Sequence, residues 1–242
     1  MRPIPTLKIS VSGVRGVIGD SLTPEMVVRF AQAFGTYVGG GRVVIGRDPR
    51  TSGEMMRQAV IAGLVSSGCR VSDIGVCPTP TVQLLVRQLE AAGGIAITAS
   101  HNPPEWNALK FVGANGLFLS AARGRELLDI YHQGDYTKVP GSAQRAPEVI
   151  PDAVERHVQA VVDGIGVLPA GPRRLKVVVD PGGGAAAVAA PRVVEALGAE
   201  VVAIHTVADG RFPRPAEPVA ENLGALVDAV RSESADVGFA QD

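Results

Sequence analysis

The chain has 242 residues, of which 46% are hydrophobic and 19% charged, and its formal net charge is −1 at pH 7. This length suits one to two domains, and the near-neutral charge leaves no basic excess for binding nucleic acid or an anionic membrane surface. The N-terminus MRPIPTLKIS lacks a signal-type apolar stretch, and the apolar tract AAAVAAP is far shorter than a membrane span. We therefore expect a cytoplasmic protein with neither nucleic acid nor membrane as a partner.

The first half of the chain alternates helix and strand patterns. Thr23 is a cap candidate ahead of Pro24, and the periodic run that follows closes on glycine, which predicts a helix over 23–40. Further helices are predicted over 52–68, 79–94 and 120–134, and strands over 42–48, 70–76, 95–98, 108–112 and 116–120. Strands separated by helices of this length need crossover connections, so we expect a largely parallel sheet with helices on its faces.

The two cysteines, Cys69 and Cys77, flank one of these strands. Their spacing does not match C-x-x-C, and no histidine cluster lies near them in the sequence. We expect buried free thiols, as is usual in a reducing compartment.

Residues 134–148 interrupt the alternation with Gly, Pro and polar residues, which is typical of a linker. The pattern then resumes with helices predicted over 150–165, 187–198 and 222–233 and strands over 175–180, 199–205 and 235–240. The sequence thus predicts two consecutive three-layer α/β domains with mostly parallel mixed sheets, at 1–140 and 148–242. Because the last residue directly follows an apolar strand, we expect the chain to be an incomplete fragment.

The stretch GGIAITASHNPPEWNALKF, residues 93–111, contains the leading site candidate. Ser100 lies two residues beyond a predicted strand, and open α/β sheets bind ligands beyond the carboxyl ends of their strands. A structural role is the alternative, because Ser100 and Asn102 are turn formers and Pro103 fixes the exit from the turn.

An acylating serine is excluded by the residues around Ser100. The sequence lacks G-x-S-x-G, and the adjacent His101 is poorly placed to take the serine proton in a triad. Phosphoryl transfer instead needs positioning and positive charge around the transferring oxygens. Arg15, Arg47 and Lys110 lie with His101 on predicted loops or strand ends that can face one cleft.

Five motifs carry a resemblance to one family. ITASHNPPEWNALKF resembles the active-site serine loop of the α-D-phosphohexomutases, the family of phosphoglucomutase, phosphomannomutase and phosphoglucosamine mutase. SGVRG, GRDPRTSG, VCPTPT and DGRFPRPAEPVAENL resemble further motifs of that family and occur in its order. The resemblance spans the whole chain and implies a phosphoglucomutase-like fold.

The resemblance also implies a chemistry. Ser100 would carry a phosphate and pass it to a hexose phosphate, so that phosphate moves between C1 and C6 through a hexose 1,6-bisphosphate. His101, Lys110 and Arg15 are candidates for proton transfer or charge stabilisation. Mg²⁺ is the implied cofactor, held by the Ser100 phosphate and by Asp242, which matches the first aspartate of the family's D-x-D-x-D loop.

By the same motif, Arg47 and Asp48 are interpreted as structural residues that brace their loop. The family pattern has four domains, and this chain reaches only the second. We therefore expect weak Mg²⁺ binding and negligible turnover from the chain alone. The sequence leaves open which of glucose, mannose and glucosamine phosphate is preferred, and it leaves the oligomeric state open.

Two other function classes stay open at this stage. Gly182-x-Gly184-x-x-Ala187 follows a predicted strand and formally meets the dinucleotide-binding pattern of an oxidoreductase. Against that class, Asp180 and Pro181 put a carboxylate and a rigid turn where a pyrophosphate would approach, so a tight strand-to-helix turn is the better interpretation. A noncatalytic sugar-phosphate-binding module is the second alternative.

Overall fold

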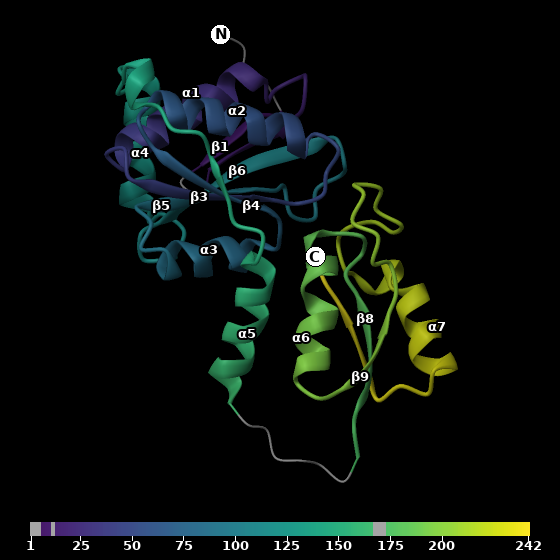
Figure 1. Cartoon of the computed structure of the whole chain (residues 1–242). Coiled ribbons are helices and arrows are strands. Elements are labelled where there is room, and N and C mark those ends of the chain that lie inside the picture. Colours follow the sequence, from purple (N-terminus) through teal and green to yellow (C-terminus); the bar gives the residue numbers. More distant parts are fainter. Residues whose placement is uncertain (1–5, 11–12, 167–172) are drawn as a thin grey trace.

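The computed structural model describes residues 6–10, 13–166 and 173–242, which form two sheets with helices around each (Figure 1). In the described residues the first sheet has seven strands in the spatial order β1-β2-β6-β5-β3-β4-β7. Their bounds are β1 (Lys8–Ser10), β2 (Gly13–Val17), β3 (Arg42–Arg47), β4 (Arg70–Val76), β5 (Gly93–Ile97), β6 (Trp106–Gly113) and β7 (Glu148–Val149).

The first sheet is mixed. Strands β5, β3, β4 and β7 are parallel to one another, whereas β1, β2, β6 and β5 are antiparallel neighbours. The parallel strands β3, β4 and β5 are joined through helices, as crossover connections require. Strand β5 instead returns to its neighbour β6 through the Ser100 loop without a helix. The loop therefore lies at the carboxyl end of β5, next to the carboxyl end of β3.

The helices of this half are α1 (Pro24–Tyr37), α2 (Gly53–Ser66), α3 (Thr79–Gln88), α4 (Ala121–Gln133) and α5 (Ala153–Ile165). Side-chain caps start two of them where the sequence predicts, because Thr23 accepts a hydrogen bond from the Met26 amide and Ser120 accepts one from the Arg123 amide. Gly134 ends α4 in the left-handed conformation, with φ of 71°.

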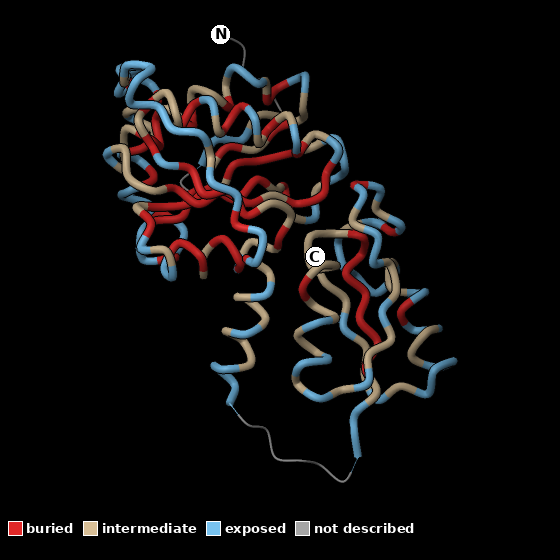
Figure 2. Tube along the Cα trace, viewed as in Figure 1, coloured by how far each residue is buried: buried red, intermediate tan, exposed pale blue. Residues whose placement is uncertain are grey.

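Two apolar clusters pack on opposite faces of the first sheet, which makes this half a three-layer structure (Figure 2). Phe30, Phe34 and Phe111 lie in the cluster beneath α1, α2 and α4. The smaller cluster beneath α3 and α5 includes Val82 and Val112. Cys69 and Cys77 are buried free thiols, which confirms the prediction for both.

Residues 134–148 run along the first half of the molecule. Tyr136 is buried against it, the Val139 amide bonds to the Ser66 carbonyl, and β7 extends the sheet beside β4. Helix α5 follows, and its His157 Nδ1 lies 2.7 Å from Thr81 Oγ1 on α3. The domain limits 1–140 and 148–242 stay a prediction.

The second sheet is fully parallel in its described strands, in the order β10-β8-β9. Its elements are β8 (Lys176–Asp180), α6 (Ala190–Ala196), β9 (Glu200–Ala203), α7 (Gly224–Ser232) and β10 (Val237–Ala240). Helices α6 and α7 lie on the two sides of β8 in the view (Figure 1), so this half is also layered. Across both sheets parallel pairings outnumber antiparallel ones, as expected.

The structure differs from the sequence-based expectations at three places. Residues 116–120 form no strand, because Gly116 turns the chain at φ of 76° and Phe118 makes only an isolated bridge to Val112. The helix expected over 187–198 splits into a 3₁₀ turn (Ala185–Val188) and α6, with a proline in the first turn of α6. Strands β1 and β2 were not predicted, because both are short and β2 contains two glycines.

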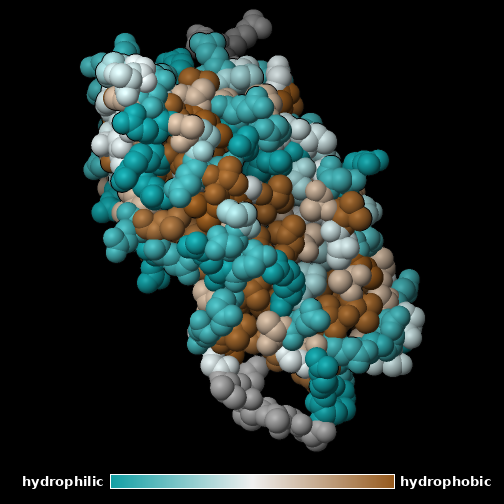
Figure 3. Space-filling view, viewed as in Figure 1, coloured by the Kyte–Doolittle hydropathy of each residue, from teal (hydrophilic) through white to brown (hydrophobic). Residues whose placement is uncertain are grey.

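No helix in the described ranges is long and apolar enough to cross a membrane. On the face shown in Figure 3, hydrophobic patches are interspersed with hydrophilic side chains.

Candidate functional site

Ser100 has a backbone conformation that non-glycine residues rarely adopt. Its φ is 56°, a conformation that costs about 1 to 3 kcal/mol and persists only because the surrounding structure holds it. The Ser100 amide donates to Thr98 Oγ1 over 3.1 Å, and the Asn102 amide donates to the Ala99 carbonyl over 3.2 Å. The Thr98 side chain and a backbone turn therefore hold the loop, whereas the Ser100 and Asn102 side chains bond to Asp242 and Arg15 and not to the nearby backbone.

Arg50 holds the Ser100 loop from beneath, and sequence reasoning missed it. Its side chain is 0% exposed, and Asp48 accepts from its Nε over 3.0 Å. Every remaining N–H of the guanidinium donates to a backbone carbonyl of the loop or of the start of β6, those of Ser100, Asn102, Pro103 and Trp106. One rigid, fully hydrogen-bonded fork thus sets the path of the loop.

Asp48 braces its own loop, as expected, by accepting from the Arg50 amide over 3.1 Å, and Arg47 lies half-buried beside it. Arg47 donates to the Asp48 carbonyl and has a 3.6 Å contact with Glu54.

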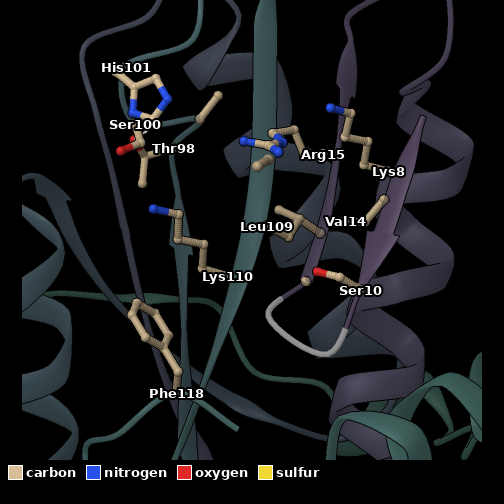
Figure 4. Close-up of a pocket in the computed structure, with 13 residues that line it drawn as sticks. Lys8, Ser10, Val14, Arg15, Thr98, Ser100, His101, Leu109, Lys110 and Phe118 are labelled. Carbon is tan, nitrogen blue, oxygen red and sulfur yellow. Dashed lines mark hydrogen bonds between the residues drawn. The ribbon is translucent and has the colours of Figure 1, made fainter. Parts of the chain in front are cut away.

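Ser100, His101, Arg15 and Lys110, the residues expected at a site, line one pocket of about 400 Å³ (Figure 4). Register explains part of this arrangement. Arg15 on β2 pairs with Ala108 on β6, and Lys110 lies two residues further along the same face of β6. The Ser100 loop then closes one side of the pocket.

The two cations nearest Ser100 differ in their surroundings. Arg15 Nη1 donates to Asn102 Oδ1 over 3.0 Å, which orients the guanidinium toward the Ser100 loop. Burial lowers the pKa of Lys110, while the charges of Asp242 and Asp48 oppose that shift. The lowered pKa makes Lys110 a candidate for proton transfer.

Asp242 reaches Ser100 from the second half of the molecule. Ser100 Oγ donates to Asp242 Oδ2 over 2.6 Å, and His101 Nδ1 lies 3.7 Å from the same oxygen. The serine hydroxyl is thus engaged by a carboxylate and not by the neighbouring imidazole, in agreement with the argument against a triad.

Arg214 holds the Asp242 side of this contact in the way that Arg50 holds the Ser100 side. It pairs with Asp180, which is 0% exposed, through a 2.9 Å bond from Nε. The remaining N–H groups donate to backbone carbonyls, among them that of Gln241 at 3.0 Å. Two buried arginine–aspartate pairs therefore hold the backbone on both sides of the contact between Ser100 and Asp242.

The two halves also touch directly around Arg50. The Arg50 guanidinium lies 5.2 Å from the centre of the Phe212 ring. Gly210, at φ of 81°, approaches so closely that a Cβ there would lie 2.6 Å from the Pro49 carbonyl oxygen. Loop 209–216 is thus seated against loop 48–51.

The glycine turn after β8 is occupied by Arg214. A Cβ on Gly182 would lie 2.9 Å from that guanidinium, and the Gly182 amide bonds to Asp180 Oδ1. The turn leads into a 3₁₀ turn, and α6 begins only at Ala190. A dinucleotide pyrophosphate therefore has neither the space nor the helix N-terminus that it needs, which leaves the tight-turn interpretation.

The oxygens at Ser100 and Asp242 suit a hard cation such as Mg²⁺, which prefers oxygen ligands. The nearby carboxylates Asp48 and Asp180 are taken by their arginines. No group of three or more His, Cys, Asp or Glu side chains suited to a metal occurs within the described ranges.

Two family models match the chain, one for phosphoglucomutase/phosphomannomutase α/β/α domain I over residues 6–138 and one for domain II over residues 155–242. The chain belongs to the phosphoglucomutase/phosphomannomutase family. The two matched stretches are the first two α/β/α domains of that family, and nearly all of α5 falls within the second although it packs against α3.

Two similar family members come from Thermococcus kodakarensis. The chain is 40% identical over 235 residues to a Thermococcus kodakarensis protein named "Probable phosphoglucosamine mutase", covering 96% of this chain and 50% of that protein. A protein of the same organism named "Phosphoglucomutase/phosphomannomutase" is 38% identical over 240 residues, with coverage of 95% and 52%. The chain spans about half the length of these relatives.

A solved family structure shows the same fold. The phosphoglucomutase/phosphomannomutase family protein from Burkholderia thailandensis superimposes with a TM-score of 0.80 at 30% identity, covering 96% of this chain and 51% of that one. The expected phosphoglucomutase-like architecture is thus confirmed.

Proposed function

We propose that this chain is the phosphoryl-transfer half of a phosphohexomutase, in which Ser100 exchanges a phosphate with a hexose phosphate through a hexose 1,6-bisphosphate. The observation that carries the proposal is the strained Ser100 at the end of β5, held by Arg50 and facing a pocket with Arg15 and Lys110. Membership of the phosphoglucomutase/phosphomannomutase family supports it. Hexose phosphates are the substrates that family membership implies.

In the proposed step, a sugar hydroxyl oxygen attacks the phosphorus carried by Ser100. A new P–O bond to the sugar forms as the bond between phosphorus and Ser100 Oγ breaks. The hydroxyl proton leaves to a base, and Oγ gains a proton to restore the serine hydroxyl. Lys110 is the proposed base, because burial lowers its pKa, and His101 is a second candidate for proton transfer.

The remaining residues position and neutralise charge. Arg15, held by Asn102, stabilises the phosphoryl oxygens, since this transfer depends mainly on positioning and electrostatics. Asp242 accepts the hydroxyl hydrogen of the unphosphorylated serine. Ser100 and Asp242 are the residues that would hold Mg²⁺, which when bound neutralises charge on the phosphoryl oxygens.

The test is phosphorylation of Ser100. The chain is incubated with glucose 1,6-bisphosphate and Mg²⁺, and intact mass followed by peptide mapping locates the phosphate. We expect one added phosphoryl group on Ser100 and none in Ser100→Ala. The control is Ser142→Ala, which alters an exposed serine within residues 134–148 and should leave the labelling unchanged. Labelling that survives in Ser100→Ala contradicts the proposal. Binding of the sugar phosphate without labelling favours the noncatalytic module.

A further inference from the structure

Lys8 lies on the edge strand β1, directly opposite Arg15 of β2 in the antiparallel register. Side chains directly opposite each other point to the same face of a sheet, with Cβ atoms about 4.5 to 5.5 Å apart. Two positive charges therefore stand side by side on the face that lines the Ser100 pocket.

Lys110 adds a third cation to the same face. Arg15 pairs with Ala108, and Lys110 follows two positions later on β6. Since neighbouring strands are about 4.8 Å apart, the Cα atoms of Lys8 and Lys110 lie roughly 10 to 12 Å apart, on either side of Arg15. Figure 4 shows Lys8, Arg15 and Lys110 as neighbours across the pocket.

In the described residues this group of cations has no ion-paired carboxylate, although the charges of Asp242 and Asp48 act on Lys110 from further away. In the part of the chain that the structure describes, no carboxylate forms an ion pair with Lys8, Arg15 or Lys110, although salt bridges occur at many other arginines. Like charges directly opposite each other destabilise a sheet. An edge lysine is also a common protection against strand pairing. That role does not require Lys8 to share a pocket wall with two further cations.

We propose that Lys8 is a third phosphate-binding cation of this pocket, which contacts a phosphate of the sugar substrate from the side of Arg15 that faces away from Ser100. The inference rests on the proposed function for the identity of the ligand, and on the sheet register for the position of the charge. Lys8 binds the anion and takes no part in proton transfer.

The probe is inorganic phosphate, titrated calorimetrically into the 242-residue chain at low salt. Lys8→Met keeps most of the side-chain volume and removes the charge, Lys8→Arg restores it, and Lys138→Met removes the same charge from an exposed lysine outside the pocket. We expect Lys8→Met to weaken phosphate binding about three- to tenfold, with recovery in Lys8→Arg and no change in Lys138→Met. Thermal unfolding of each variant checks that the fold is retained.

The outcomes separate this inference from the proposed function. Equal phosphate affinity in Lys8→Met and Lys138→Met overturns the role of Lys8, as does a wild-type chain that binds no phosphate. If phosphate binding depends on Lys8 while glucose 1,6-bisphosphate leaves Ser100 unlabelled, the anion site stands and the proposed phosphoryl transfer fails.

Discussion

Two buried arginines hold the two sides of the contact between Ser100 and Asp242. Arg50 donates to the Ser100 carbonyl, and Arg214 donates to the carbonyl of Gln241, the residue before Asp242. Each is neutralised by one aspartate and otherwise bonded to backbone carbonyls. A buried ion pair is strongly destabilising only when one partner is lost, because the other charge then remains uncompensated.

At the residue scale we therefore expect Arg50→Met to lower the free energy of unfolding by about 3 to 5 kcal/mol, because Asp48 would stay buried without its partner. Arg50→Lys should recover only part of this, since an ammonium cannot span the same set of carbonyls. Urea unfolding measures the change. Arg47→Met, on the same loop but partly exposed, is the control and should cost about 1 kcal/mol or less. Equal losses in the Arg50 and Arg47 variants would contradict the bracing role.

At the element scale, α5 is attached to α3 through a histidine. His157 Nδ1 lies 2.7 Å from Thr81 Oγ1, and Ile150 and Ala153 at the start of α5 join the apolar cluster beneath α3. Burial lowers the pKa of His157 below its ordinary value of 6.5. The neutral imidazole is therefore the form that the packed helix favours.

Acidification should weaken this attachment. The pKa of His157 is lower in the folded chain than in the unfolded chain, so the unfolded chain binds the proton more readily. The contribution of His157 to the free energy of unfolding is therefore present above pH 6.5 and is lost as the pH falls below that value. Thermal unfolding at pH 8 and pH 5 measures the change. The unfolding temperature of His157→Gln should fall less between pH 8 and pH 5 than that of the wild type. His132, exposed on α4, provides the control as His132→Gln. An identical pH dependence in the wild type and His157→Gln would show that this histidine does not contribute.

At the scale of the whole molecule, the site exists because the second half of the chain is seated on the first. Phe212 covers the Arg50 guanidinium, and Gly210 allows its loop to approach the Pro49 carbonyl. The position of Asp242 beside Ser100 depends on this seating, since the two residues are 142 positions apart in the chain.

Gly210→Ala tests the seating. The new Cβ would lie 2.6 Å from the Pro49 carbonyl oxygen, so the loop must move away. Gly198→Ala is a matched control, because Gly198 also has a positive φ, of 93°, but a Cβ there meets nothing within 4 Å. Both variants should lose about 1 kcal/mol or more of stability through backbone strain. Only Gly210→Ala should enlarge the radius of gyration in small-angle X-ray scattering, and an unchanged radius there would argue that the loop does not hold the halves together.

Much of the fold could be predicted from local sequence. The Thr23 and Ser120 caps and the Gly134 terminator set helix ends, and the β-branched runs at 42–48 and 70–76 became β3 and β4. These signals depend only on neighbouring residues, so they can be recognised without knowledge of the fold. The strand expected over 116–120 was wrong because Gly116 turns the chain before a ladder can form.

The sequence by itself determined that Ser100 follows a strand in a turn-rich loop, that cations are available near it, and that its motifs resemble the phosphohexomutases. Tertiary structure alone decided which groups meet there. Pairing of β1 with β2 and of β2 with β6 places Lys8, Arg15 and Lys110 on one face, and burial makes Arg50 the brace of the loop. Such long-range contacts depend on strand register and on the removal of water from buried charges, and neither is encoded in a local pattern of residues.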